Sequence, residues 1–174
     1  MITLIQRQRV QAPLALVALL LAASLAACDQ RRPLAPSFES AEALAEVVLD
    51  RYRAGDEAGL RALALTEQEF RQHVWPELPA ARPERNLPFS YVWGDLRQKS
   101  DQRLAMLLAR HRGRSYRLEA VAFGEATTYA SYTVHRESRF TVVADDGAEV
   151  EERFCGSLIE KDGRWKVFSF VTDN

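Results

Sequence analysis

The fold of this chain is decided by the stretch Gly156-Ser157-Leu158-Ile159-Glu160-Lys161-Asp162-Gly163-Arg164-Trp165-Lys166-Val167. An Asp-Gly pair between two apolar stretches is a strong signal for a β-hairpin. Asp146-Gly147 is a second such pair, and each pair predicts a two-residue loop. The strands expected around these turns are residues 117–123, 129–144, 149–160 and 164–172. The second half of the chain therefore predicts a four-stranded antiparallel meander.

The first half of the chain predicts helices. Ser40, Asp56 and Thr66 are good N-caps, and each precedes apolar residues at helical spacing. Residues 76–88 contain four prolines, which predicts an irregular connection that could form a lid or rim. Residues 89–111 carry apolar side chains along one face and predict the longest helix. Helices followed by strands indicate an α+β fold, with the N-terminal helices packed on one face of a curved sheet.

The N-terminus has the pattern of a secretory signal. Arg7 and Arg9 precede an apolar stretch of 16 residues, 12–27, which is short for a transmembrane helix of about 20 residues. The stretch ends at Leu25-Ala26-Ala27-Cys28, which resembles the lipobox of bacterial lipoproteins. A plain membrane anchor and a cleavable signal with a coincidental cysteine are the alternatives.

The lipobox implies a domain organisation and a location. Residues 1–27 would be a lipoprotein signal peptide, residues 28–39 a lipidated N-terminus with a short tether, and residues 40–174 a single α+β domain. The thiol of Cys28 would carry the lipid that holds the protein on a membrane of the cell envelope, facing the periplasm or the exterior. Asp29 resembles the signal that keeps lipoproteins of enteric bacteria in the inner membrane, and so favours that membrane.

Composition excludes some partners. Removal of the first 27 of 174 residues leaves 147, enough for one domain with a real core. That part has 21 basic residues, because Arg7 and Arg9 are lost from 23, against 24 acidic ones, so nucleic acid is not an expected partner. Cys155 is the only other cysteine. We expect it to be a small buried apolar residue, and the alternative is a reactive thiol.

Two segments resemble a known superfamily. Tyr52-Arg53-Ala54-Gly55-Asp56 and the last hairpin, residues 156–167, are similar to the opening and ending of nuclear transport factor 2-like (cystatin-like) domains. This resemblance covers residues 40–172 and implies a cone-shaped α+β domain with a curved sheet. Superfamily enzymes such as ketosteroid isomerase and the polyketide cyclases use Asp, Tyr or His inside the cone. No motif of this chain corresponds to those residues one by one.

The two expected turns also predict which residues share a face of the sheet. One face would hold Ile159, Cys155, Phe168, Phe170, Val134, Phe140 and Val142, and we assign it to the helices. The opposite face would hold Leu158 and Val167, together with His135, Glu137, Arg139, Glu152 and Trp165. The functional interpretation is a polar site in which His135 and Glu137 act as acid-base residues and Arg139, Glu152 and Trp165 contact a ligand. The alternative is a solvated or dimer-forming face, and a single β-bulge would exchange the faces.

Two hypotheses for function remain. No Gly-rich phosphate loop, metal-spaced His or Cys cluster, or serine nucleophile motif is present, so no metal or cofactor is expected. The first hypothesis is a non-catalytic envelope lipoprotein that binds another envelope protein or a small apolar ligand. The second is a small acid-base enzyme, isomerase- or cyclase-like, drawing on His135, Glu137, Tyr91 and Tyr129.

The last two strands carry apolar residues on both faces, while the helices are expected to cover only one. Either residues 76–88 or a second copy of the chain must shield the other face, and we predict a homodimer. Trp165 is expected to pack beneath the last turn.

Overall fold

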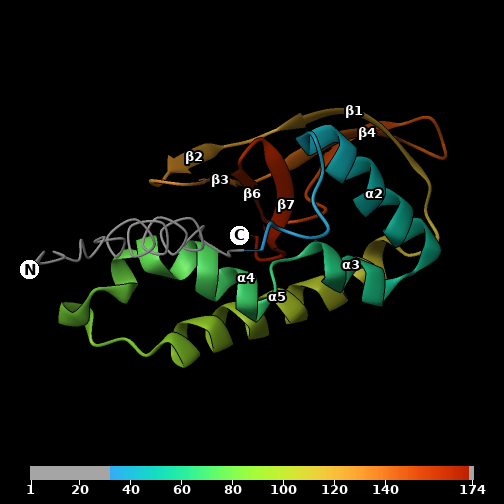
Figure 1. Ribbon diagram of the computed structural model, residues 1–174. Helices are drawn as coiled ribbons and strands as arrows, with labels where there is room; N and C mark the ends of the chain where they lie inside the picture. Colours follow the sequence, from blue (N-terminus) through green and yellow to red (C-terminus); the bar gives the residue numbers. More distant parts are fainter. Residues whose placement is uncertain (1–31, 173–174) are drawn as a thin grey trace, which may run out of the picture. The chain divides into compact units, whose positions relative to one another are not determined.

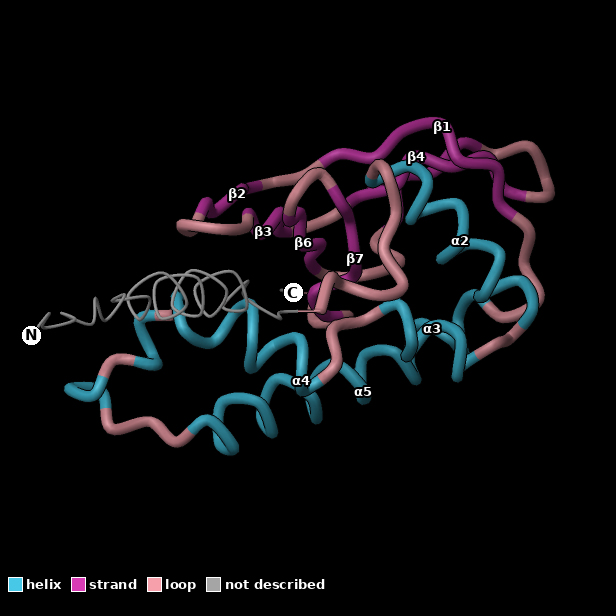
Figure 2. The backbone as a smooth tube through the Cα atoms, viewed as in Figure 1, coloured by secondary structure: helices cyan, strands magenta, loops and turns pink. Residues whose placement is uncertain are grey.

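The computed structural model describes residues 32–172, so the lipobox with Cys28 and Asp29 lies outside the described residues. Residues 33–172 belong to one compact unit, in which helices are followed by two antiparallel sheets (Figures 1 and 2). The expected α+β class is therefore confirmed. Among residues 32–172, no helix is both long enough and apolar enough to cross a membrane.

The helices begin where their capping residues predict. α2 spans Ala41–Ala54 and follows Ser40, whose Oγ accepts a hydrogen bond from the Ala43 N–H at 3.1 Å. Asp56 caps α3 (Glu57–Leu63) in the same way. Thr66 forms a capping box with Glu69 and opens α4 (Glu67–Glu69), which continues as the π-helical turn η1 (Phe70–Val74).

The proline-rich connection consists of three short 3₁₀ turns, and a long helix follows it. These turns are η2 (Trp75–Glu77), η3 (Pro79–Ala81) and η4 (Pro83–Arg85). α5 spans Phe89–His111 without a break. Ser100, in the middle of α5, is buried, and its Oγ accepts a hydrogen bond from the Phe170 N–H at 3.0 Å. This bond fastens the helix to the end of the last strand.

Between residues 32 and 172 seven strands form two sheets, where the sequence predicts four strands in one meander. The strands are β1 (Tyr116–Ala122), β2 (Glu125–Thr128), β3 (Thr133–Arg136), β4 (Arg139–Ala144), β5 (Glu149–Glu152), β6 (Ser157–Lys161) and β7 (Arg164–Ser169). The order is β1-β4-β5 in one sheet and β2-β3-β6-β7 in the other. The two longest predicted strands are each divided between the sheets, so the four-strand prediction is wrong.

Two breaks cause this division, and they contact each other. The first is at Glu137, whose φ of 51° is not a strand conformation. The second is at residues 153–156, and a Cβ on Gly156 would lie 1.7 Å from the Val171 carbonyl oxygen. The Gly156 carbonyl accepts a hydrogen bond from the Ser138 N–H at 2.9 Å. Gly156 allows this close approach because it has no side chain.

The predicted register is right for one hairpin and shifted in the other. Around Asp162-Gly163, Leu158 pairs with Val167 and Glu160 pairs with Trp165, as expected. In the β4–β5 hairpin Val142 pairs with Val150, because the loop has three residues, 145–147, rather than two. A residue with positive φ at the end of a three-residue loop is a common arrangement, and Gly147 has φ 82°.

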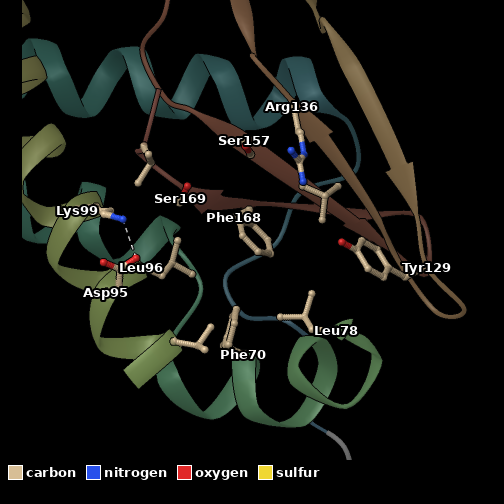
Figure 3. Close-up of a pocket in the computed structure, with 13 residues that line it drawn as sticks. Phe70, Leu78, Asp95, Leu96, Lys99, Tyr129, Arg136, Ser157, Phe168 and Ser169 are labelled. Atoms are coloured by element: carbon tan, nitrogen blue, oxygen red, sulfur yellow. Dashed lines mark hydrogen bonds and ion pairs between the residues drawn. The ribbon is translucent and has the colours of Figure 1, made fainter. Parts of the chain in front are cut away.

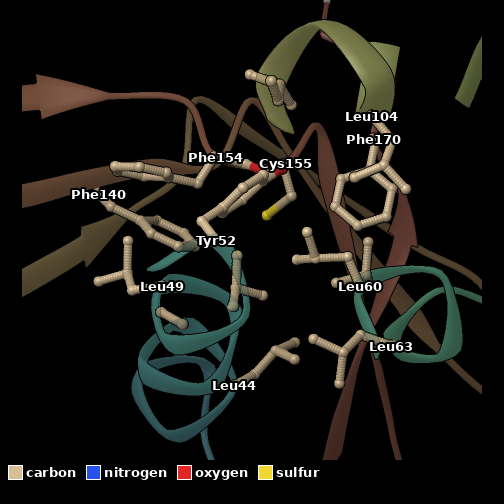
Figure 4. Packing of buried hydrophobic residues seen from close by; sticks show 14 of the residues in the cluster. Leu44, Leu49, Tyr52, Leu60, Leu63, Leu104, Phe140, Phe154, Cys155 and Phe170 are labelled. Carbon is tan, nitrogen blue, oxygen red and sulfur yellow. Dashed lines mark hydrogen bonds between the residues drawn. The ribbon is translucent and has the colours of Figure 1, made fainter. Parts of the chain in front are cut away.

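The larger hydrophobic core lies between the sheets and helices α2, α3 and α5 (Figure 4). The Tyr52 hydroxyl at its centre donates a 2.8 Å hydrogen bond to the Phe154 carbonyl. Cys155 and Phe170 belong to this core together with Leu158, whereas the predicted faces separate them from Leu158. The reason is the irregularity between Ser157 and Leu158, which changes the alternation of the strand.

A second core covers the other face of the four-stranded sheet. Its buried members are Leu34, Leu65, Phe70, Val74, Tyr132, Val134 and Ile159. Partly buried residues of the proline-rich connection and of α5 pack against it, among them Trp75 of η2, Leu78 and Trp93. Both faces of the sheet are therefore covered by this chain, and the expectation that helices cover only one face is wrong. A second copy of the chain is therefore not needed to cover the sheet, and the homodimer stays a prediction.

The second half of the expected tether packs on the domain. Leu34 is buried in the second core. Phe38 pairs with Trp165 through two backbone hydrogen bonds of 2.9 and 2.8 Å, which extends the sheet by one bridge. Leu34 and Phe38, which were expected in the tether, therefore supply apolar side chains to the two cores.

A buried ion pair holds this segment. Lys166 is fully buried, and its Nζ lies 3.0 Å from Glu69 Oε1 and 2.7 Å from the Ala35 carbonyl oxygen. Glu69 also accepts hydrogen bonds from the backbone N–H groups of Ala35 and Thr66. Burial raises the pKa of Glu69, but these bonds and Lys166 outweigh it and leave the pKa below its ordinary value.

Candidate ligand-binding cleft

A cleft of about 400 Å³ lies between the four-stranded sheet and the helical segment η1–α5 (Figure 3). Its apolar lining consists of Phe70, Leu78, Val92, Leu96, Tyr129, Val134, Phe168 and Val171. Its polar lining consists of Asp95, Lys99, Arg136, Ser157 and Ser169. The apolar residues come mainly from the second core, so the cleft is the part of that core that stays open.

Aromatic packing fixes the floor of the cleft. Phe70 is buried, and its ring centroid lies 5.3 Å from that of Trp93 and 6.2 Å from that of Phe168. Leu78 reaches the cleft from the proline-rich connection, which agrees with the expectation that this connection forms a rim. Phe70 and Phe168 are 98 positions apart in the chain, so the floor exists only once the chain has folded.

One face of α5 forms a wall. Val92, Asp95, Leu96 and Lys99 all line the cleft, and their spacing of three and four residues places them on the same side of the helix. Lys99 Nζ lies 2.8 Å from Asp95 Oδ2. The hydrogen bond to Asp95 and the charge of that carboxylate raise the pKa of Lys99. These two charges compensate each other.

Arg136 carries the remaining charge of the lining. It is the last residue of β3, is exposed, and directs its guanidinium group into the cleft (Figure 3). Among residues 32–172, no carboxylate forms an ion pair with it. Once the Asp95–Lys99 pair is set aside, the lining has a net charge of one positive unit.

Hydroxyl groups lie between this charge and the apolar floor. Ser157 and Ser169 are partners across the β6–β7 hairpin and both line the cleft. Tyr129 lines it from the other side, with its ring stacked on Tyr132 at a centroid distance of 4.6 Å. The cleft thus offers hydrogen-bonding groups beside a cation at one end and apolar side chains at the other.

His135 and Trp165, two predicted site residues, lie together on the opposite face of the same sheet. Their ring centroids are 4.6 Å apart, and Phe123 covers both at 4.9 and 5.9 Å. His135 Nε2 lies 3.2 Å from Glu160 Oε2. The histidine therefore meets a carboxylate, but it meets Glu160 rather than Glu137, and neither residue of this pair lines the cleft. Trp165 is half-buried near the last turn, as expected.

The other predicted site residues lie elsewhere. Glu137 stands at the strand break, with Oε2 3.7 Å from the Arg153 guanidinium. Arg139 and Glu152 line a separate hollow of about 310 Å³ at the three-stranded sheet. The expected polar face is thus divided between two sheets, because the chain changes sheet after Glu137. Of the residues proposed for an enzyme, Tyr129 lines the cleft, while Tyr91 is 65% exposed on α5.

Neither metal binding nor thiol chemistry finds support in the described part of the chain. Residues 32–172 contain no group of three His, Cys, Asp or Glu side chains that could hold a metal ion. Cys155 is fully buried, and burial raises the pKa of its thiol to about 12. The expectation of a small buried apolar residue is confirmed, since a thiol with this pKa stays protonated.

The sequence analysis missed the residues that form the cleft, apart from Tyr129. The spacing of Val92, Leu96 and Lys99 places them on one side of a helix, but nothing in the sequence marks that side as the wall of a cleft. Arg136 shows no signal in the sequence, because its role depends on where β3 ends.

Comparison with known proteins does not add to this description: no protein-family model matches the chain, no curated protein matches its sequence, and no solved structure matches its fold. Its function has to follow from the residues of the cleft.

Proposed function

We propose that this chain is a lipid-anchored envelope protein whose α+β domain is a non-catalytic binding module for a small, largely apolar ligand. The cleft beside the second core carries this proposal. Its volume of about 400 Å³ lies in the range typical of small-molecule sites, which are mostly apolar with a few placed polar groups. The cone-like shape of nuclear transport factor 2-like domains is part of the proposal, supported by the helical opening and the final hairpin.

The apolar lining supports a ligand held by burial rather than by reaction. A methylene group that leaves water contributes about 0.8 kcal/mol, so each methylene group that an alkyl chain buries against this lining favours binding. The His135–Glu160 pair, which could serve in acid-base chemistry, lies outside the cleft. A binding module accounts for the residues that line the cleft.

The anchor rests on the sequence Leu25-Ala26-Ala27-Cys28. If Cys28 is acylated, the Cys28→Ala variant will remain an unprocessed precursor that takes up no labelled fatty acid, while the wild-type chain becomes labelled. Equal labelling of the two proteins would remove the lipoprotein from the proposal and leave the binding module to be judged separately.

The ligand site can be tested by photolabelling. The full chain in lipid nanodiscs is exposed to a medium-chain alcohol that carries a diazirine near its methyl end, and labelled peptides are identified by mass spectrometry. We expect labels on cleft residues of η1, α5 and β7. Val92→Trp should fill the cleft and abolish this labelling. Met106→Trp is the matched control, because Met106 lies on the same helix and is 61% exposed.

Two results would count against the proposal. One is labelling scattered over the surface without a preference for the cleft. The other is labelling of the cleft that Val92→Trp and Met106→Trp reduce equally, because the added ring would then act through the helix as a whole and not through the space that it fills.

A further inference from the structure

We infer that the cleft selects amphipathic monocarboxylates, with the apolar chain on the aromatic floor and the carboxylate on Arg136. This inference rests on the proposed function and adds the chemical class of the ligand.

The charge of the lining sets the charge of the ligand. Asp95 and Lys99 neutralise each other at 2.8 Å, so Arg136 is the uncompensated charge of the lining. A ligand with one negative charge would complete the site, whereas a neutral ligand would leave the guanidinium group without a counter-charge. A ligand with two negative charges would need a second cation that the lining does not offer.

The neighbouring carboxylates do not occupy Arg136. Glu137, the next residue, has its carboxylate 3.7 Å from Arg153. Glu125 is the cross-strand partner of Arg136 in the β2–β3 pair, but the two side chains form no ion pair. The guanidinium group is directed into the cleft instead (Figure 3). It is therefore available to a ligand that enters the cleft.

The geometry of the groups favours a carboxylate. The planar guanidinium group of an arginine matches a carboxylate with two parallel hydrogen bonds. Ser157 and Ser169 line the same cleft and add hydroxyl groups to its polar lining. Phe70, Leu96 and Phe168 lie beyond them, as Figure 3 shows, and provide an apolar surface for the chain of the ligand.

The test compares two probes with the same photoreactive tail, one ending in a carboxylate and the other in an alcohol. Each is applied to the full chain in nanodiscs, as wild type, Arg136→Gln and the control Arg117→Gln, whose arginine is exposed and pairs with Glu119. A charge-assisted hydrogen bond at an exposed site predicts that Arg136→Gln weakens carboxylate labelling of the cleft about tenfold. Alcohol labelling should stay unchanged, and Arg117→Gln should behave as wild type.

Each outcome separates the inference from the proposed function. If both probes label the cleft and Arg136→Gln changes neither, the carboxylate selectivity is overturned and the binding module stands. If neither probe labels the cleft, the proposed function fails and the inference fails with it. Octyl phosphate that displaces the carboxylate probe better than octanoate does would overturn the assignment of the head group.

Discussion

His111 should make the stability of the domain depend on pH. It is the last residue of α5 and only 1% exposed, with its ring centroid 4.6 Å from that of Phe154. Its Nδ1 lies 3.0 Å from the Tyr116 hydroxyl, while its Nε2 is buried without a hydrogen-bond partner. A second ring proton would therefore be buried without an acceptor. Burial lowers the pKa of His111 from 6.5 to about 4, although the nearby Glu152 opposes this.

The sign and size of the effect follow from this pKa. Between pH 6.5 and about 4, the unfolded chain binds a proton on His111 and the folded chain does not. The free energy of unfolding is thus unaffected above pH 6.5 and falls as the pH drops toward 4. One pKa unit corresponds to 1.36 kcal/mol, so His111 should remove about 2.5 kcal/mol between pH 7 and pH 4.5.

The assay is urea unfolding of the full chain in detergent, followed by tryptophan fluorescence at pH 7 and pH 4.5. His111→Leu should lose about 2.5 kcal/mol less than the wild-type chain between these two pH values. Tyr116→Phe is the control, because it removes the hydrogen-bond partner of His111 and keeps the buried imidazole. If His111→Leu and the wild-type chain lost the same free energy of unfolding on acidification, the claim that folded His111 resists protonation would be refuted.

Three further predictions concern stability. Glu69→Gln should lower the free energy of unfolding by about 3–5 kcal/mol, because it leaves Lys166 buried without its counter-charge. The double variant Glu69→Gln, Lys166→Met should recover part of this loss when the proteins are compared by urea unfolding. Gly156→Ala should lower the melting temperature strongly, because the added Cβ would lie 1.7 Å from the Val171 carbonyl oxygen. An unchanged melting temperature would show that the backbone at residues 153–156 can move to make room for the methyl group. Trp165→Ala should lower the free energy of unfolding by about 3 kcal/mol, the lower end of the range for a large aromatic residue, because Trp165 is only half-buried. No loss of stability in calorimetry would contradict the packing of Trp165.

Local chemistry made much of the fold predictable. Ser40, Asp56 and Thr66 cap helices as expected, because a capping bond involves residues only two or three positions apart. The hairpin at Asp162-Gly163 has the expected register for the same reason. Where a few neighbouring residues determine the structure, the sequence pattern was sufficient.

Long-range contacts decided the rest. The breaks at Glu137 and Gly156 stabilise each other through the Ser138–Gly156 hydrogen bond, and no periodicity reveals a contact between segments so far apart. The second core was missed for the same reason, because Leu34 and Phe70 join Ile159 from distant parts of the chain. The cleft lies beside that core, so Arg136 could not be chosen over His135 before the two faces of the sheet were known.

The attachment of residues 34–38 has a mechanical consequence. A force applied to the chain at Arg32 acts on the buried Leu34 and on the contacts of Ala35 with Lys166 and Glu69 before it reaches the two hydrogen bonds between Phe38 and Trp165. The load therefore enters the domain through β7 and α4 before it reaches α2. Tension on the N-terminus would pull on β7, and Phe168 and Ser169 at the end of this strand line the cleft.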